Sequence, residues 1–222
     1  MKFEIECMSL DQMLNGGIEN GALTEFYGEA GSGKTNICLQ LLRNCVRNKK
    51  KAIFIDTEGV SLERLNQICS DKNDFDDVYK GILFFEVYSL AEQDNAIRQA
   101  MKLVESVEIG LIVLDSATIY YRIGLGKDGE LESRRSLTEQ IINLLNIARK
   151  KNIPVVITNQ VFTDIEKKIF NSIGGQALKH IPEAIIKLEK IGIGKRRAII
   201  EKHRSLPEGL SCEFYLTDKG VE

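Results

Sequence analysis

The chain has 222 residues, of which 43% are hydrophobic, so it can bury the core of one domain but hardly of two. Its 30 lysines and arginines against 32 acidic residues leave a net charge of −2. The net charge of a nearly neutral chain gives no indication that it binds nucleic acid or a membrane. Any such partner must therefore bind at a local charged patch.

The first predicted feature along the chain is a short lead-in, residues 1–20. Charges stand among its first six residues, and no stretch of the sequence approaches the roughly 18 apolar residues of a membrane span. We therefore expect a cytoplasmic protein without a membrane partner.

The five cysteines are widely spaced and form no C-x-x-C pair, which indicates reduced thiols rather than disulfides or a zinc site: Cys7, Cys38, Cys45, Cys69 and Cys212.

Short runs of β-branched and aromatic residues then alternate with longer segments that have the apolar spacing of helices. This alternation predicts an α/β fold with a mostly parallel sheet covered by helices. The predicted strands are residues 22–28, 51–57, 82–87, 111–116 and 154–161, and the predicted helices are residues 35–48, 89–106 and 133–151. Ser89 and Glu92 form a capping-box pattern at the start of the second helix.

After residue 183 the pattern changes to strand-like runs joined by turns that contain glycine. No helix is predicted between these runs, so they form an antiparallel extension of the sheet over residues 184–192, 195–203 and 211–218. No linker, low-complexity tract or internal repeat is evident. The sequence therefore predicts a single domain over residues 1–222.

A glycine-rich segment, GEAGSGKT at residues 28–35, fits the G-x-x-x-x-G-K-[ST] pattern between a predicted strand and a predicted helix. Such a loop turns its backbone N–H groups inward, and the helix adds its positive N-terminal end, so together they hold the oxygens of a di- or triphosphate. Lys34 would reach the β and γ phosphates, and the Thr35 hydroxyl would bind Mg²⁺. An ordinary glycine-rich turn is the alternative. The candidate nucleotide-binding residues are Gly28, Glu29, Ala30, Gly31, Ser32, Gly33, Lys34, Thr35 and Asn36.

Further polar residues follow predicted strands and should meet the phosphates at the carboxyl edge of the sheet. Asp115 ends LIVLD and is the second candidate for Mg²⁺, through water, although a helix cap is the alternative. Glu58 is the candidate for orienting the attacking water, with Asp56 as a supporting hydrogen-bond acceptor. Asn159 and Gln160 would reach the same edge, where an amide can contact the γ phosphate. For Gln160 the alternative is a strand-end amide that satisfies loop backbone.

The segments GEAGSGKT, FIDTEG, LIVLDS and TNQ, in this order and spacing, resemble the core of the RecA-type recombinases, especially archaeal RadA and its shorter paralogue RadB. The resemblance extends from LDQMLNGGIENGALTEFYGE to SLPEGLSCEFYLTDKGVE, and the short chain and its KHR segment favour the RadB group. It implies a RecA-like P-loop NTPase core, with a mostly parallel twisted sheet flanked by helices and antiparallel strands at the C-terminal end.

The resemblance also implies a role for each matching residue. Lys34 and Thr35 bind phosphate and magnesium, and Asp115 is the Walker B acid. Glu58 activates water and Gln160 senses the γ phosphate, so that the catalytic candidates are Glu58, Lys34 and Gln160.

Other implied roles concern the base and the DNA. Arg64 matches an arginine that packs on adenine in the relatives, in a segment one residue shorter here than in RadA. Two DNA-facing loops of the family would fall at residues 120–132 and 161–175. Tyrosines in the first loop could stack on bases or could simply pack. The DNA-binding candidates are Tyr120, Tyr121, Arg122, Lys127, Lys167 and Lys168.

One segment carries a local excess of positive charge: residues 179–204 contain eight lysines and arginines against three glutamates. Where RadA has an Asp-containing segment that caps a neighbour's ATP, this chain has Lys202, His203 and Arg204. These residues could form a solvated strand face, contact ATP of a neighbouring subunit in trans, or follow DNA phosphates.

RadA also has a helical DNA-binding domain and a Phe-x-x-Ala linker ahead of this core, and we expect neither here because MKFEIECMSL runs almost directly into the core. The resemblance thus implies a nucleoid-associated accessory protein of recombination and repair. It would bind ATP, Mg²⁺ and single-stranded DNA and hydrolyse ATP weakly in a DNA-dependent way. Duplex DNA, other recombination or replication proteins and further copies of the chain are additional candidate partners.

Two alternative functions belong to other classes. One is a filament-forming strand-exchange recombinase with a DNA-stimulated ATPase. The other is a KaiC-like regulatory ATPase that acts on protein partners. A small-molecule kinase fits the closing antiparallel strands and the TNQ segment poorly.

Overall fold

The computed structural model describes residues 2–124, 130–164, 169–172 and 175–222. Lys127, Lys167 and Lys168, three of the predicted DNA-binding residues, lie outside these ranges. Among the described helices, none is both long and apolar enough to cross a membrane.

A ten-stranded sheet forms the centre of the molecule, with the strand order β12-β11-β10-β9-β3-β7-β6-β4-β5 and β8 paired to β7. The six strands from β9 to β5 in this order run parallel, and β10, β11 and β12 continue the sheet antiparallel, as the sequence predicts. The strands are β3 (Leu23–Gly28), β4 (Lys51–Asp56), β5 (Ile82–Glu86), β6 (Ile109–Asp115), β7 (Val155–Asp164), β8 (Ile169–Ser172), β9 (Ala184–Lys190), β10 (Lys195–His203), β11 (Ser211–Thr217) and β12 (Gly220–Val221).

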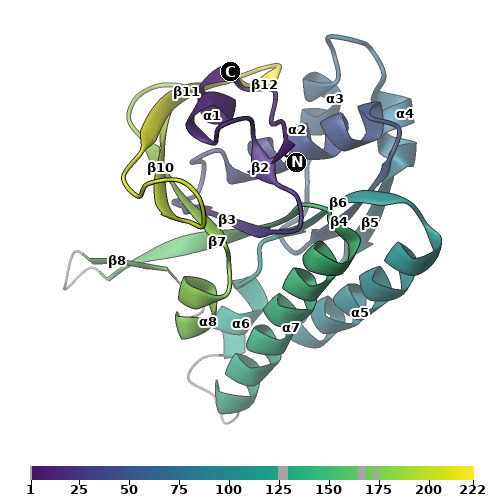
Figure 1. Cartoon of the computed structure of the whole chain (residues 1–222), viewed down its shortest axis with the longest axis vertical. Coiled ribbons are helices and arrows are strands. Elements are labelled where there is room, and N and C mark those ends of the chain that lie inside the picture. The colour runs from purple at the N-terminus through teal and green to yellow at the C-terminus, as the bar shows by residue number, and fades with distance from the viewer. Residues whose placement is uncertain (1, 125–129, 165–168, 173–174) are drawn as a thin grey trace.

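Helices cover both faces of this sheet (Figure 1). One face carries α2 (Lys34–Arg47), α3 (Leu62–Ile68) and α4 (Phe75–Gly81), and the other carries α5 (Leu90–Ser106) and α7 (Glu130–Lys151), with α6 (Ile119–Gly124) and α8 (Gly175–His180) beside them. Two hydrophobic clusters fill the layers, one under α2 and one under α5 and α7. Four of the five free cysteines are buried.

The start of α5 differs slightly from the predicted capping box. The Ser89 hydroxyl accepts the Glu92 N–H at 3.1 Å, as expected for an N-cap. The Glu92 carboxylate accepts the N–H of Tyr88 at 2.9 Å, one residue before the N-cap position of a standard box.

The predicted lead-in is part of the folded core. β1 (Lys2–Phe3) pairs antiparallel with β2 (Ile18–Glu19), and α1 (Met8–Met13) lies between them. The side chain of Gln40 on α2 donates to the carbonyl of Ile5 at 3.0 Å and accepts the N–H of Val221 at 2.8 Å. The helix that follows the glycine-rich loop therefore holds both the lead-in and the last strand.

Candidate nucleotide-binding site

The alternation of side chains along each strand decides which polar residues face α2. In β6, Val113 lies in the core under α2, so Asp115 two residues later faces the same side. In β7, Val156 lies in the same core, which places Thr158 and Gln160 on that face as well. Asp115 and Gln160 thus line one pocket together with the glycine-rich loop, which connects β3 to α2.

The glycine-rich loop is shaped by close backbone approach. A Cβ at Gly28 would lie 2.2 Å from the carbonyl oxygen of Leu188 on the neighbouring strand β9. Gly33, the N-cap of α2, has a φ of 105° in the left-handed region, which favours glycine. Ser32 Oγ is buried and has no hydrogen-bond partner among the described residues. A buried hydroxyl without a partner beside a helix N-terminus fits an incoming phosphate oxygen.

Lys34 lies folded over this loop. Its Nζ donates to the carbonyl oxygens of Gly28 and Glu29, both at 2.9 Å. Burial lowers the pKa of Lys34, while the carboxylates of Asp115 and Glu58 oppose that effect. The lysine is thus a buried cation whose present partners are neutral carbonyls.

Asp115 is buried at the end of β6, with a hydroxyl on either side. The Thr158 hydroxyl donates to its carboxylate. Burial raises the pKa of Asp115, and hydrogen bonds from Thr158 and Thr35 act in the opposite direction. A carboxylate in hydrogen-bonding contact with the hydroxyl of Thr35 is a donor set that fits Mg²⁺, which takes oxygen ligands and retains several waters.

Glu58 and Gln160 contact each other across the mouth of the site. Gln160 Nε2 donates to Glu58 Oε1 at 2.8 Å. Both line a pocket of about 120 Å³ together with Lys34, Thr35 and Asp115. The structure therefore brings the predicted catalytic and metal-binding side chains around one small cavity.

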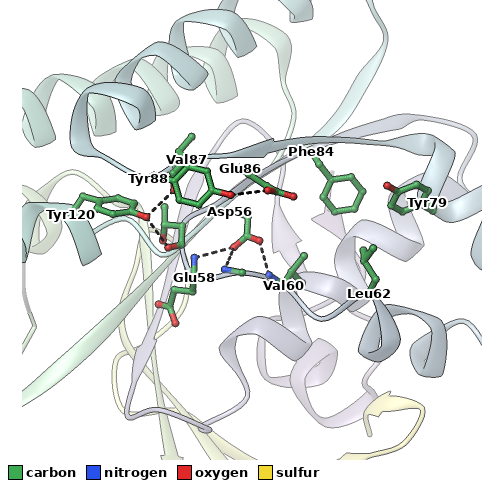
Figure 2. Close-up of a pocket in the computed structure, with 12 residues that line it drawn as sticks. Asp56, Glu58, Val60, Leu62, Tyr79, Phe84, Glu86, Val87, Tyr88 and Tyr120 are labelled. Carbon is green, nitrogen blue, oxygen red and sulfur yellow. Dashed lines mark hydrogen bonds between the residues drawn. The ribbon is translucent and has the colours of Figure 1, made fainter.

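Asp56 supports the loop that carries Glu58. Its carboxylate accepts the backbone N–H groups of Glu58 at 3.0 Å, Gly59 at 2.9 Å and Val60 at 2.6 Å (Figure 2). This is the supporting role as a hydrogen-bond acceptor that the sequence predicts for Asp56.

Arg64 lies beside the first turn of α2. Its Nε donates to Asn36 Oδ1 at 2.6 Å, and its Nη2 and Nη1 donate to the carbonyls of Thr217 at 2.6 Å and Asp218 at 3.0 Å. Arg64 and Asn36, both predicted to bind nucleotide, are thus connected to each other and to the turn between β11 and β12. Of the two, Asn36 lines the pocket.

The tyrosines after β6 occupy different environments. Tyr121 is only 4% exposed and packs in the core under α5 and α7, so in this conformation its ring does not face solvent. The Tyr120 hydroxyl donates to the carbonyl of Val87 at 2.9 Å (Figure 2). Arg122, the third candidate of this group, lies in α6.

The basic residues at the end of β10 have partners within the chain. Lys202 Nζ donates to the carbonyl of His180 at 2.8 Å. The Arg204 guanidinium pairs with the carboxylate of Glu19, which also lies 4.0 Å from His203. Burial lowers the pKa of His203, while Glu19 opposes that effect.

Sequence reasoning missed a polar network on the opposite face of the sheet. Asn159 does not reach the nucleotide edge with Gln160; its Nδ2 donates to Glu25 Oε1 at 2.9 Å, and its Oδ1 accepts the Thr118 hydroxyl at 2.7 Å. Adjacent residues of a strand point to opposite faces, which explains the difference. The one available signal was a glutamate inside the apolar run ALTEFYG.

Burial raises the pKa of Glu25 to about 7. Because the same carboxyl in an unfolded chain titrates near 4.5, the folded state binds this proton more tightly than the unfolded state does. The resulting contribution to stability is complete below pH 4.5 and is lost as the pH rises through 7. We expect the free energy of unfolding of the wild type to fall, relative to Glu25→Gln, by on the order of 3 kcal/mol across this window.

Urea unfolding at a series of pH values measures this difference. Glu139→Gln, on an exposed position of α7, is the control and should follow the wild-type curve. Parallel curves for the wild type and Glu25→Gln would show that Glu25 titrates normally in the fold.

Comparison with known proteins gives a consistent set of relatives. The Rad51 family model matches residues 1–222. The DNA repair and recombination protein RadB of Methanococcoides burtonii is 50% identical over 97% of this chain and 95% of its own length, and RadB of Archaeoglobus fulgidus is 41% identical over 96% and 94%. A crystal structure of the RadB recombinase superposes with a TM-score of 0.85 at 34% identity and covers 99% of this chain and 98% of that one.

Proposed function

Since the chain belongs to the Rad51 family, as a DNA repair and recombination protein of the RadB type, we propose that it binds ATP with Mg²⁺ and couples the bound nucleotide to DNA binding. The observation that carries this proposal is the contact of Gln160 with Glu58 at the pocket beside Lys34. Gln160 directly precedes residues 161–175, the segment expected to face DNA.

Each residue of the pocket has a part in this proposal. Thr35 and Asp115 would hold Mg²⁺, which neutralises charge on the phosphate oxygens. Lys34 would exchange its two carbonyl partners for phosphate oxygens, a gain because a cation pairs more strongly with an anion than with a neutral group. Glu58 would orient the attacking water from the loop that Asp56 holds in place.

Gln160 is the proposed link between the two ligands. In the structure the Gln160 amide donates to Glu58, the residue proposed to orient the attacking water. A γ phosphate competes for the same amide, so that nucleotide binding would release Glu58 and shift β7 at the point where it continues into residues 161–175. Weak hydrolysis, further copies of the chain and other recombination proteins as partners belong to the same proposal.

A DNA titration with the wild type and Gln160→Ala tests the coupling. For the wild type we expect the affinity for labelled single-stranded DNA to be about tenfold higher with ATP and Mg²⁺ than with ADP and Mg²⁺. In Gln160→Ala the two affinities should be equal, because the amide that distinguishes the nucleotides is gone, while ATP still binds.

Salt serves as the internal control of this titration. DNA affinity must fall steeply as salt rises, because phosphate contacts release counterions. If the wild type bound no DNA in a salt-dependent way, a regulatory ATPase acting on protein partners would replace this proposal. If the nucleotide changed DNA affinity equally in both proteins, Gln160 would not be the link.

A further inference from the structure

A second and larger pocket lies on the other side of the loop that carries Glu58. Its volume is about 460 Å³, and it is enclosed by residues 56–60, the ends of β5 and α4, and Tyr120 (Figure 2). Sites that hold ligands commonly have volumes of about 300–1,000 Å³. Of the residues that line this pocket, the proposed nucleotide site involves only those of the loop at residues 56–60.

Aromatic and apolar side chains are exposed in this pocket. Tyr88 is 71% exposed, and Tyr79 and Leu62 are each 42% exposed. The Phe84 ring lies 5.3 Å from the Tyr79 ring, which continues the aromatic wall inward. Exposed apolar side chains gathered in one hollow, rather than scattered singly, indicate a binding surface.

The charge of the pocket is negative. Of the twelve described residues that line it, none is basic and three are acidic. Asp56 is occupied by the three backbone N–H groups of its own loop. Glu86 is exposed at the rim, and within the described part of the chain its carboxylate accepts the Tyr88 hydroxyl alone, at 2.9 Å, in a bond that a ligand can join or replace (Figure 2).

These features select among ligands. A nucleic-acid base can stack on tyrosine, but its phosphates would meet acidic side chains, and the described lining residues offer them no cation. A guanidinium group satisfies both features at once, because it stacks on an aromatic face and forms paired hydrogen bonds with a carboxylate. An ammonium group lacks the planar, forked geometry for doing both.

We propose that this pocket binds an arginine side chain presented by an extended segment of a protein partner. The guanidinium stacks on Tyr88 and pairs with Glu86. Apolar residues next to the arginine pack on Leu62 and Tyr79, which a free cation would leave exposed. Because Thr57 to Val60 also carry Glu58, the bound segment contacts the loop of the nucleotide site directly.

The experiment uses a fluorescent reporter in the pocket. The chain has no tryptophan, so Tyr88→Trp introduces a single indole at an exposed rim position and retains an aromatic face for the cation. The probe is a blocked peptide Gly-Leu-Arg-Leu-Gly, compared with the same peptide containing neutral citrulline, with acetyl-arginine amide, and with oligo-dT.

The arginine peptide should change the tryptophan emission saturably and bind about tenfold more tightly than the citrulline peptide or the free amide. Glu86→Gln in the same background should reduce its affinity to that of the citrulline peptide. Glu108→Gln removes a carboxylate that is also exposed, at the opposite end of the sheet, and should leave binding unchanged. Equal thermal midpoints will verify that the variants are folded.

Several results would overturn the proposal. Equal binding of the arginine and citrulline peptides would show that the pocket does not recognise the positive charge. Unaltered binding in Glu86→Gln would show that Glu86 does not pair with the guanidinium. If acetyl-arginine amide bound as tightly as the peptide, the site would take a free cation and not a protein segment. Tighter binding of oligo-dT would assign the pocket to DNA. Protein association that itself changes the emission and blocks the peptide would assign it to a second copy.

Discussion

Lys34→Ala is expected to lower the affinity for ATP in the presence of Mg²⁺ by about 100-fold, because one buried charge-assisted contact to phosphate is lost. The Nζ of Lys34 lies at the pocket and, among the described residues, donates to the carbonyls of Gly28 and Glu29, so its removal leaves no described side chain without its hydrogen-bond partner. Titration calorimetry with ATP and Mg²⁺ measures the change directly.

The matched control for this lysine is Lys102→Ala, which truncates an exposed lysine on α5. It should bind ATP and unfold like the wild type, and circular dichroism should verify that Lys34→Ala is folded at the temperature of the titration. An ATP affinity of Lys34→Ala within a factor of about three of the wild type would contradict the proposed nucleotide site, since such a difference is below about 0.7 kcal/mol.

Gly28→Ala is expected to destabilise the fold by about 3 kcal/mol, because an added methyl group collides with main chain that has no room to move. Its Cβ would lie 2.2 Å from the Leu188 carbonyl and 2.9 Å from Ser32 Oγ. The collision would separate β9 from β3 where the phosphate loop begins, so ATP binding should weaken together with stability. Urea unfolding followed by circular dichroism gives the first quantity.

Gly209→Ala separates the collision from the general cost of replacing glycine. Gly209 has a φ of +84°, yet a Cβ there meets nothing within 4 Å. It should cost about 1 kcal/mol through backbone strain alone. If Gly28→Ala were no more harmful than Gly209→Ala, β9 could not be packed against the loop as closely as the structure has it.

The parallel core was predictable because its signals are local. Each buried strand is a short apolar run, and the glycine-rich segment lies between a strand and a helix in the sequence itself. The short helices α3, α4, α6 and α8 were not predicted, because segments of six or seven residues are too short to display a clear helical period. The lead-in escaped prediction since its partners, β11 and the side chain of Gln40, lie far away in the sequence.

The site was predictable to the same extent. Asp115 and Gln160 could be predicted because they lie at the ends of predicted strands. Which of Asn159 and Gln160 faces the nucleotide depends on which face of the sheet each side chain points to, and Glu25, the partner of Asn159, is 134 positions away in the sequence. The same holds for Arg204, which the sequence left open between three roles and which pairs with a distant glutamate, Glu19. The aromatic pocket at Tyr88 unites three separate segments, so no sequence window contains it.

The hydrogen bonds of α2 to both ends of the fold have a consequence for measurement. Lys34 and Thr35 form its first turn, while Gln40 holds Ile5 and Val221 less than two turns later. Phosphate binding at the first turn of α2 is expected to reduce the motion of this helix, and with it the motion of the segments that are hydrogen-bonded to Gln40. Deuterium uptake at the Val221 amide should therefore slow when nucleotide binds, which gives a readout of occupancy far from the ligand and independent of catalysis.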